Sequence, residues 1–252
     1  FKPNGVFSLN NNLCLMHGGP FANIAHGCNT IIALNTALKY GKYVITEAGF
    51  GSDLGMEKFI DIVGQQYMYP DCVVIACSLR SIIQHSNKTG NEIEDIKLGL
   101  TNLQQHINNI KAFGVNFVVA INKFTNDSEE SINFLSNWLN EQNIPFALCD
   151  WFNLGAAGAV DLAKKVIEQS NKPCTIKPIY KVTDTLENKI KSIVNRAYGL
   201  HNIVYLDQAK EKLVKFNNLP YYVCMAKTPL SLSTDWTFIS GPSLSTLSNL
   251  AV

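Results

Sequence analysis

The sequence predicts an α/β protein with a mostly parallel sheet and helices on both faces. Short β-branched runs alternate along the chain with longer helical stretches, a pattern typical of strand–helix–strand crossovers. Residues 72–79 are apolar except for Ser78, as expected for a strand buried on both faces. Residues 93–113 show the periodicity of a long amphipathic helix. Together these observations favour a parallel sheet covered by helices.

The first elements are assigned from local patterns. The run Leu-Cys-Leu-Met predicts a strand at residues 13–17. The run Tyr-Val-Ile-Thr at residues 43–46 is rich in β-branched residues and predicts a second strand. Between them, residues 22–40 carry isoleucine and leucine at helical spacing. Gly49, Gly51 and Gly55 then predict a turn before a helix through Lys58 and Ile62.

The later elements alternate regularly. Strands are expected at residues 72–79, 116–122, 146–149 and 221–225. Helices are expected at residues 93–113, 128–142, 158–170, 184–198 and 207–216. Ser128 is placed as the N-cap of its helix. We expect a parallel α/β domain over residues 1–172. A smaller C-terminal α/β portion, mainly helical with an irregular tail rich in Ser, Thr and Leu, follows over residues 173–252.

Composition narrows the class of function. The 252 residues carry 21 basic and 20 acidic side chains, for a net charge of +1, which argues against disorder and against a broad nucleic-acid surface. No apolar run is long enough for a membrane span, and no signal peptide is apparent. The only arginines are Arg80 and Arg196.

The seven cysteines are interpreted as buried free thiols in a reducing cytosol. They are odd in number and form no CxxC pair, and several lie within apolar runs. Disulfides or a zinc site are the alternatives. The spacing of His and Cys matches no metal site, and no GxSxG elbow or HExxH helix occurs.

Two segments near the start could surround an anion. His17-Gly-Gly-Pro begins a tight loop after a strand, and the next helix would direct its free amides into that loop. His26 is expected one turn inside this helix, as a site residue or as an ordinary structural histidine. The second segment, Thr46–Lys58, contains a Gly-rich loop whose backbone could come close to a bound ligand. Glu47 and Asp53 in it could bind cationic groups or cap the helix.

Two further segments follow strands. Phe124 and Trp151 occupy equivalent positions after neighbouring strands, where parallel sheets bind their ligands. Either aromatic alone could belong to the core, but the matched pair favours a clamp on a planar ring. Arg80 and His85 follow the 72–79 strand and so belong to the same side of the sheet.

Together these segments resemble the formate–tetrahydrofolate ligase family. The run His17-Gly-Gly-Pro-Phe-Ala-Asn-Ile-Ala-His-Gly-Cys-Asn29 is similar to that family's HxGPFANIAHGCNS. The run Tyr43-Val-Ile-Thr-Glu-Ala-Gly-Phe-Gly-Ser-Asp-Leu-Gly-Met-Glu-Lys-Phe59 is similar to its YVVTEAGFGADLGAEKF. Val118–Asn122 and Met225–Thr228 also fit. Runs of this length are far more specific than a lone glycine motif.

The resemblance implies a Rossmann-like layer related to P-loop NTPases and a ligase of one-carbon metabolism. Formate, ATP with Mg²⁺ and tetrahydrofolate would be the small-molecule substrates, with formyl phosphate as intermediate and 10-formyltetrahydrofolate as product. It implies a cytoplasmic homo-oligomer without nucleic-acid or membrane partners. By similarity, Phe124 and Trp151 would sandwich the pterin, and His26, Glu47 and Asp53 would be catalytic. Gly49, Phe50, Gly51 and Arg80 would face formyl phosphate.

The chain also departs from the family pattern. Nothing in it matches the Gly-rich, Lys-containing loop that holds ATP, and residues 59–64 lack two basic residues of the family. Since the chain also begins with Phe1, we expect a C-terminal part of such a ligase that is inactive alone. The alternative is a catalytically degenerate folate-binding paralogue or a subunit that pairs with an ATP-binding chain. An unrelated Rossmann oxidoreductase is disfavoured because GxGxxG is absent.

Overall fold

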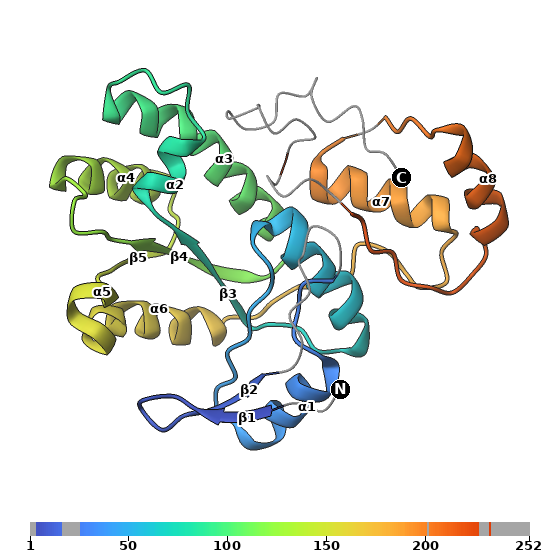
Figure 1. Cartoon of the computed structure of the whole chain (residues 1–252), viewed down its shortest axis with the longest axis horizontal. Helices are drawn as coiled ribbons and strands as arrows, with labels where there is room; N and C mark the ends of the chain where they lie inside the picture. Colours follow the sequence, from blue (N-terminus) through green and yellow to red (C-terminus); the bar gives the residue numbers. More distant parts are fainter. Residues whose placement is uncertain (1–3, 17–25, 201, 227–231, 233–252) are drawn as a thin grey trace. The chain divides into compact units, whose positions relative to one another are not determined.

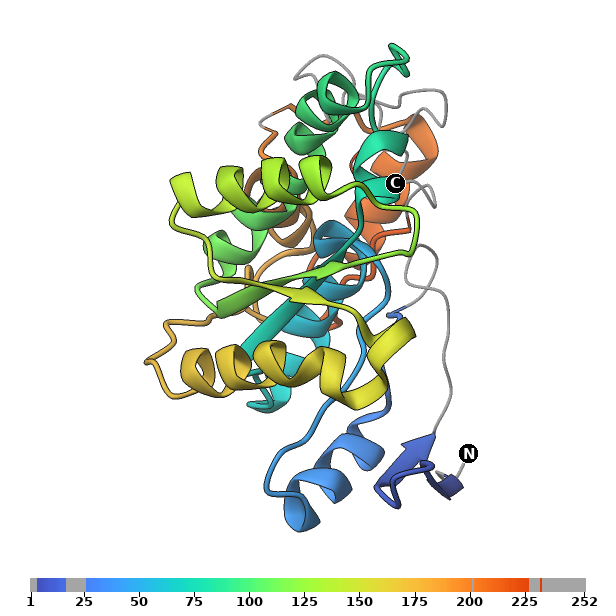
Figure 2. The same ribbon diagram turned by 90° about the vertical axis from the view of Figure 1, so that its left-hand side faces the viewer.

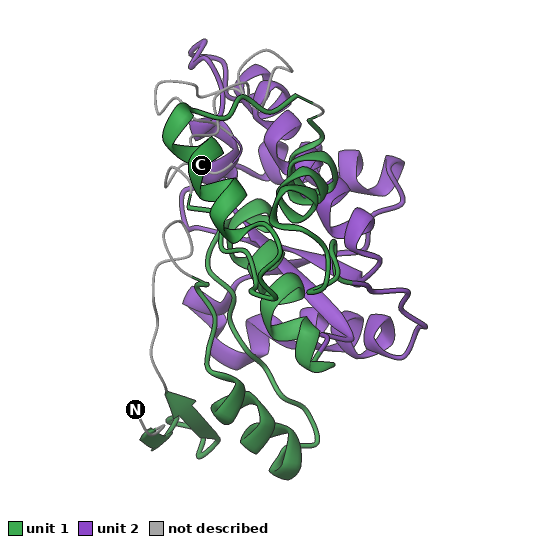
Figure 3. Cartoon of the chain, turned by 90° about the vertical axis from the view of Figure 1, so that its right-hand side faces the viewer, with its two compact units in different colours: residues 1–68, 178–231, 249–252 green, residues 69–177, 232–248 purple. Residues whose placement is uncertain are grey.

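A computed structural model describes residues 4–16, 26–200, 202–226 and 232 of the chain (Figure 1). The chain divides into two compact units (Figure 3). Unit 1 comprises residues 1–68, 178–231 and 249–252, and unit 2 comprises residues 69–177 and 232–248. The predicted α/β class is confirmed. The division at residue 172 stays a prediction.

Unit 2 is built on a three-stranded parallel sheet. Its strands are β3 (Cys72–Cys77), β4 (Asn116–Asn122) and β5 (Phe146–Cys149), in the spatial order β3-β4-β5. The helices α3 (Glu92–Phe113) and α4 (Glu129–Glu141) connect successive strands and lie on one face of the sheet. The helix α6 (Val160–Ser170) covers the other face (Figure 2).

The core of unit 2 follows from the sequence patterns. Residues 118–121 of β4 are fully buried, as are Ile96 and Ile107 of α3 and Leu135 of α4. Each of the valine, leucine and isoleucine side chains among them contributes about 1.5–3 kcal/mol through burial. The hydroxyl of Ser128 accepts a hydrogen bond from the Ser131 amide at 3.1 Å, so the predicted N-cap is confirmed.

The prediction that residues 72–79 are buried on both faces is wrong. The strand ends at Cys77 because Ser78 caps the short helix α2 (Leu79–Gln84). In the described sheet β3 has a neighbour on one side only. Val74 and Ala76, which lie on the same face of β3, are exposed despite their apolar character, so this face of the strand is not buried.

The chain after β5 forms more helix than expected. The turn α5 (Trp151–Leu154) and the 3₁₀ segment η4 (Gly155–Ala159) precede α6. Asp150 caps α5, since its carboxylate accepts a hydrogen bond from the Asn153 amide at 3.3 Å. Trp151 is therefore the first residue of a helical turn directly after the strand end.

Unit 1 contains a hairpin and several helical segments. The strands β1 (Asn4–Phe7) and β2 (Leu13–Met16) pair antiparallel, and α1 (Ile31–Tyr40) lies beside them (Figure 1). The remaining helical elements are the π-helical η1 (Gly51–Met56) and η2 (Phe59–Val63), the 3₁₀ turn η3 (Gly64–Gln66), α7 (Leu186–Tyr198) and α8 (Asp207–Phe216). The helix α7 contacts both η1 and α8.

Three predictions in unit 1 are corrected. The helix expected at 22–40 begins at Ile31, because the Thr30 hydroxyl accepts the Ala33 amide at 3.2 Å and caps it there. His26 thus precedes the helix, and residues 22–25 lie outside the described part. Residues 43–46 form no strand, and only Ala48 bridges to Cys28. Gly51 and Gly55 lie within helical backbone rather than in a preceding turn.

The strand expected at 221–225 is also absent from the described residues. Side chains hold this segment instead: the Val223 amide donates to the Tyr180 hydroxyl at 2.9 Å. The ammonium of Lys189 donates to the Tyr221 carbonyl at 2.9 Å. An apolar run can therefore satisfy its backbone without a strand partner.

Candidate functional site

The Gly-rich segment of unit 1 is held against the residues that precede α1. The Gly49 amide donates to the Gly27 carbonyl at 2.8 Å. The thiol of Cys28 donates to the His26 carbonyl at 3.1 Å and lies 3.8 Å from the Gly55 carbonyl. The structure therefore brings together the described end of the first predicted loop and the second one. His17, the other histidine of the first loop, lies outside the described residues.

A glycine–glycine contact shapes this segment. A Cβ atom on Gly55 would overlap the carbonyl oxygen and the amide nitrogen of Gly49. Gly51 has a φ of 82°, which a residue with a side chain adopts only at a steric cost. The glycines at positions 49, 51 and 55 thus permit one backbone arrangement, in which the helical segment packs against the loop that precedes it.

The predicted catalytic residues differ in their exposure. Asp53 lies in the first turn of η1 and is buried, His26 is half-buried, and Glu47 is exposed. Phe50, beside Gly49 and Gly51, is exposed as well. Asp53 is thus shielded from solvent, whereas Glu47 and Phe50 are accessible to a ligand.

Sequence reasoning missed a set of buried charged residues just after this loop. Glu57, Lys58 and Asp61 are fully buried. Asp61 accepts a hydrogen bond from the Ile179 amide at 2.6 Å. Burial, and the nearby Glu57 carboxylate, raise the pKa of Asp61 well above its ordinary value. The signal was present in the sequence as charges inside the otherwise apolar run 54–63.

The same environment acts on neighbouring groups. Burial raises the pKa of the Cys28 thiol to about 12, although the nearby Lys58 ammonium lowers it in part. Burial also raises the pKa of Tyr180 and of Tyr198. Cys28 is therefore a neutral thiol at physiological pH and a poor nucleophile.

In unit 2 the two predicted aromatic residues follow adjacent strand ends. The amide of Lys123, directly before Phe124, donates to the Cys149 carbonyl at 2.9 Å. Trp151 follows Cys149 by two residues in the sequence. The Phe124 amide donates to the Asp127 carboxylate at 2.8 Å, which fixes the loop after β4. The backbone that carries each aromatic residue is thus held by hydrogen bonds at the carboxyl edge of the sheet.

Arg80 belongs to this group through its contact with Phe124. Its guanidinium carbon lies 5.0 Å from the centroid of the Phe124 ring, within the range of a cation–π interaction. Arg80 is exposed, Phe124 is half-buried, and Trp151 is 37% exposed. The structure therefore places a cation on one face of the ring that was predicted to stack on a ligand.

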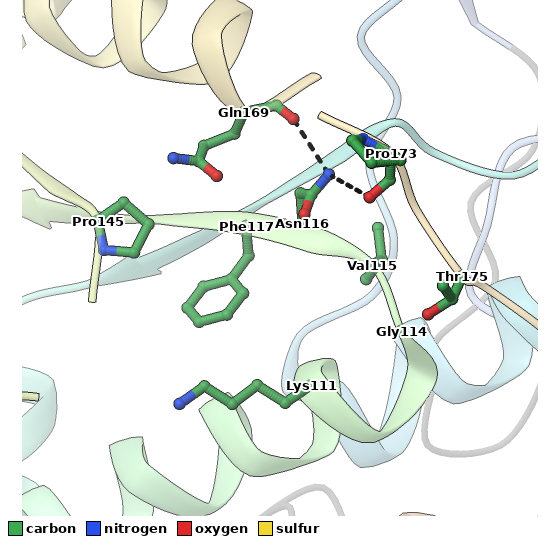
Figure 4. A pocket seen from close by; sticks show the side chains of 9 residues that line it. All are labelled: Lys111, Gly114, Val115, Asn116, Phe117, Pro145, Gln169, Pro173 and Thr175. Atoms are coloured by element: carbon green, nitrogen blue, oxygen red, sulfur yellow. Dashed lines mark hydrogen bonds between the residues drawn. The ribbon is translucent and has the colours of Figure 1, made fainter. Parts of the chain in front are cut away.

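A cavity of about 310 Å³ lies elsewhere in unit 2 (Figure 4). It surrounds the start of β4, at the amino edge of the sheet, and none of the predicted site residues line it. In it the Asn116 side-chain amide donates to the carbonyls of Gln169 and Lys172 at 3.1 and 2.9 Å. Asn116 thereby joins β4 to the end of α6. Because ligands of parallel sheets bind at the opposite edge, we do not place the site here.

Among the described residues, no three His, Cys, Asp or Glu side chains are grouped so as to hold a metal ion. Of the helices in that same part of the chain, none combines the length and the apolar character of a membrane span. The seven cysteines, all described, form no disulfide. Cys28, Cys77 and Cys149 are buried as predicted, but Cys14 and Cys224 are exposed, so the prediction of buried thiols is wrong for these two.

The fold and these anchored strand ends define an α/β protein of the class that binds ligands beyond the carboxyl edge of a parallel sheet. Residues 1–248 match the family model described as formate–tetrahydrofolate ligase. The chain belongs to the formate–tetrahydrofolate ligase family.

Similar curated proteins bear the same name. The chain is 45% identical over 241 residues to the formate–tetrahydrofolate ligase of Acholeplasma laidlawii, a match covering 93% of this chain and 46% of that protein. It is 42% identical over 251 residues to the enzyme of Staphylococcus aureus strain NCTC 8325, covering 96% of this chain and 45% of that protein. The chain thus spans a little under half the length of these relatives.

Proposed function

We propose that this chain supplies the folate-binding and formyl-transfer part of an ATP-dependent formate–tetrahydrofolate ligase. In that reaction formate attacks the γ-phosphorus of ATP, giving formyl phosphate and ADP. The N10 amine of tetrahydrofolate then attacks the formyl carbon, and phosphate leaves. The observation that carries the proposal is the pair of aromatic residues, Phe124 and Trp151, that follow hydrogen-bonded ends of adjacent parallel strands.

In this proposal the pterin ring lies between Phe124 and Trp151. Aromatic rings stack best in offset arrangements and contribute about 0.5–1.5 kcal/mol beyond the area that they bury. Arg80 already contacts Phe124, and this contact supports a role for Arg80 in keeping the ring oriented. In this proposal the Arg80 guanidinium orients the Phe124 ring, in addition to any contact that it makes with an anionic group.

The Gly-rich segment is assigned to the acyl phosphate. Backbone amides near Gly49 and Gly51 would stabilise charge on the transferring group, helped by the absence of side chains at these positions. His26 and Glu47 would be the groups that handle the proton of the attacking amine. Asp53, which is buried, would hold the helical segment in place.

We place most of the ATP site outside this chain. The sequence holds no Gly-rich, Lys-containing phosphate loop, so ATP and its Mg²⁺ would be bound mainly by other residues. The second candidate, a folate-binding subunit without catalysis, is favoured by one observation: Phe59, Ile60 and Val63 are buried in the stretch where the family carries basic residues.

Titration calorimetry of the chain with tetrahydrofolate tests the proposal. The matched control ligand is p-aminobenzoylglutamate, which has the same tail but no pterin. Saturable binding of tetrahydrofolate, at least tenfold tighter than the control ligand, is the expected result. Equal affinity for the two ligands, or no binding of tetrahydrofolate, would overturn the assignment of the aromatic pair.

A further inference from the structure

Two half-buried cysteines of unit 2 lie next to each other at the amino edge of the sheet. Cys72 is the first residue of β3, and Cys174 follows the end of α6. The Cys174 thiol donates to the Asp71 carbonyl, with sulfur and oxygen 3.4 Å apart. That carbonyl belongs to the peptide group that leads into Cys72. The Cys174 sulfur therefore lies beside the Cys72 backbone, although the two residues are more than a hundred positions apart.

Asn116 shows that the two cysteine side chains share one face of the sheet. Its side-chain amide donates to the Cys174 sulfur at 3.1 Å. Cys72 and Asn116 are register partners on the neighbouring parallel strands β3 and β4, and such partners direct their side chains to the same face. The side chains of Cys72 and Cys174 therefore both lie next to that of Asn116, on the face that α6 covers (Figure 2).

The pKa of Cys72 reflects the same proximity. Burial raises the pKa of its thiol to about 11, and the nearby Cys174 and Asp71 contribute to the rise. One charged group acts on another in this way only across a short distance. Cys72 is thus a neutral thiol at physiological pH, and we assign the first step of any exchange reaction to Cys174.

The backbone around both cysteines is held in place. Cys72 belongs to the hydrogen-bonded ladder of β3 and β4. The amide of Thr175 donates to the Gly114 carbonyl at 3.0 Å, and the ring of Pro173 restricts the backbone just before Cys174. Pro173 and Thr175 both line the cavity shown in Figure 4. Because both segments are held, the effective concentration of one thiol at the other is high in the folded chain.

We propose that Cys72 and Cys174 form a reversible thiol–disulfide pair that is oxidised by a small disulfide such as glutathione disulfide. The Cys174 thiolate attacks one sulfur of glutathione disulfide, which releases one glutathione and leaves the other bound to Cys174. The Cys72 sulfur loses its proton to solvent, attacks the Cys174 sulfur and releases the second glutathione. Each released thiolate takes up a proton. Two protein thiols thus become one disulfide, and one glutathione disulfide becomes two glutathiones.

The disulfide would join the two ends of the main segment of unit 2, residues 69–177. A crosslink between positions so far apart in the sequence restricts the unfolded chain strongly, so the oxidised chain should resist unfolding better. The pair lies at the amino edge of the sheet, whereas Phe124 and Trp151 follow the carboxyl ends of their strands. The proposal is therefore independent of folate binding and of its test.

Cys77 and Cys149 provide an internal comparison. Both are buried, and they end the strands β3 and β5, between which β4 lies. Two strand spacings place their Cα atoms at least about 9 Å apart, which exceeds the roughly 4.4–6.8 Å that a disulfide spans. Oxidation directed by the fold should therefore join Cys72 to Cys174 and should leave Cys77 and Cys149 reduced.

Equilibration of the full chain with mixtures of glutathione and glutathione disulfide tests the proposal. The substitutions Cys14→Ser and Cys224→Ser first remove the two exposed thiols, and the unaltered chain is treated in parallel. Acid quenching, alkylation and mass spectrometry of peptides then measure the disulfide between Cys72 and Cys174. Its equilibrium constant should be at least about tenfold larger in native buffer than in concentrated urea. Dithiothreitol should restore both thiols.

The matched variant is Cys72→Ser, which removes the thiol that closes the disulfide. Its Cys174 should accumulate bound glutathione instead. Thermal unfolding supplies a second readout, since oxidation should raise the unfolding temperature of the chain with both thiols but not that of Cys72→Ser. Absence of the linked peptide, an equal equilibrium constant in native buffer and in urea, or a disulfide between Cys77 and Cys149 as the main product would each overturn the proposal.

Discussion

Gly55 packs directly against the backbone of Gly49, at a distance that leaves no room for a Cβ atom on Gly55. The contact joins the start of the helical segment 51–66 to the loop that leads into it. It connects a spacing in the sequence to a specific backbone arrangement at the candidate site. The Gly49 amide is fixed on its other side by the Gly27 carbonyl.

This contact predicts that Gly55→Ala destabilises unit 1. The methyl group would overlap the Gly49 carbonyl oxygen, and overpacking of this kind costs about 1–3 kcal/mol. Urea denaturation measures the loss. The control is Gly5→Ala, where the new Cβ would lie 3.7 Å from Leu13 Cδ1 in ordinary contact. A Gly55→Ala chain as stable as the Gly5→Ala chain would contradict the overlap.

The second prediction concerns Arg80 and Phe124. A double-mutant cycle with Arg80→Gln and Phe124→Leu should give a coupling free energy of about 0.5–1 kcal/mol, as expected for a cation–π pair near solvent. Thermal unfolding of the four chains supplies the values. Strictly additive effects of the two substitutions would show that the contact at 5.0 Å carries no stabilising interaction.

The third prediction is a pH dependence that arises from Asp61. Burial raises the pKa of its carboxyl well above the ordinary value of 3.8. The folded state therefore binds this proton more tightly than the unfolded state. The resulting stabilisation is complete below about pH 3.8 and is lost as the pH rises through the raised pKa.

Asp61→Asn removes this titration while keeping an oxygen that can accept the Ile179 amide. Relative to the unaltered chain, its free energy of unfolding should increase as the pH rises from 4 to 8. Glu211→Gln on α8, an exposed acid, is the control and should show no such trend. A constant difference between the Asp61→Asn and unaltered chains across this range would show that Asp61 does not titrate as described.

The fourth prediction concerns activity. The chain alone should not form 10-formyltetrahydrofolate from formate, ATP and tetrahydrofolate, because the sequence has no phosphate loop for ATP. The absorbance of the acid-converted product provides the assay. The Staphylococcus aureus relative serves as the positive control. ATP- and formate-dependent product from the purified chain would contradict our placement of the ATP site.

The regular part of the fold was predictable because its patterns are local. The periodicity of residues 93–113, the apolar run 116–122 and the cap at Ser128 each depend on neighbours in sequence. The beginning of α1 was missed because the cap at Thr30 competes with an apolar pattern that starts earlier. The exposure of β3 was missed because strand order is not encoded in the strand itself.

The candidate site was predictable in part for a related reason. Phe124 and Trp151 could be paired because parallel strands bring their carboxyl ends together. The contact of Arg80 with the Phe124 ring could not be predicted, because the direction of a side chain that follows a strand depends on packing. The hydrogen bond between the Ile179 amide and the Asp61 carboxylate joins positions more than a hundred residues apart. No local pattern reports such a contact.

The affinity of the Trp151→Ala chain for tetrahydrofolate tests the central claim most directly. Loss of the stacking partner should weaken binding by about 0.5–1.5 kcal/mol, which corresponds to a dissociation constant raised roughly two- to tenfold. The control is Phe152→Ala, which removes the adjacent aromatic residue, 80% exposed against 37% for Trp151, and should change affinity less than about twofold. Calorimetry on the three chains decides the matter. Weaker binding by Trp151→Ala alone is the predicted result, and unchanged binding by Trp151→Ala would contradict the account.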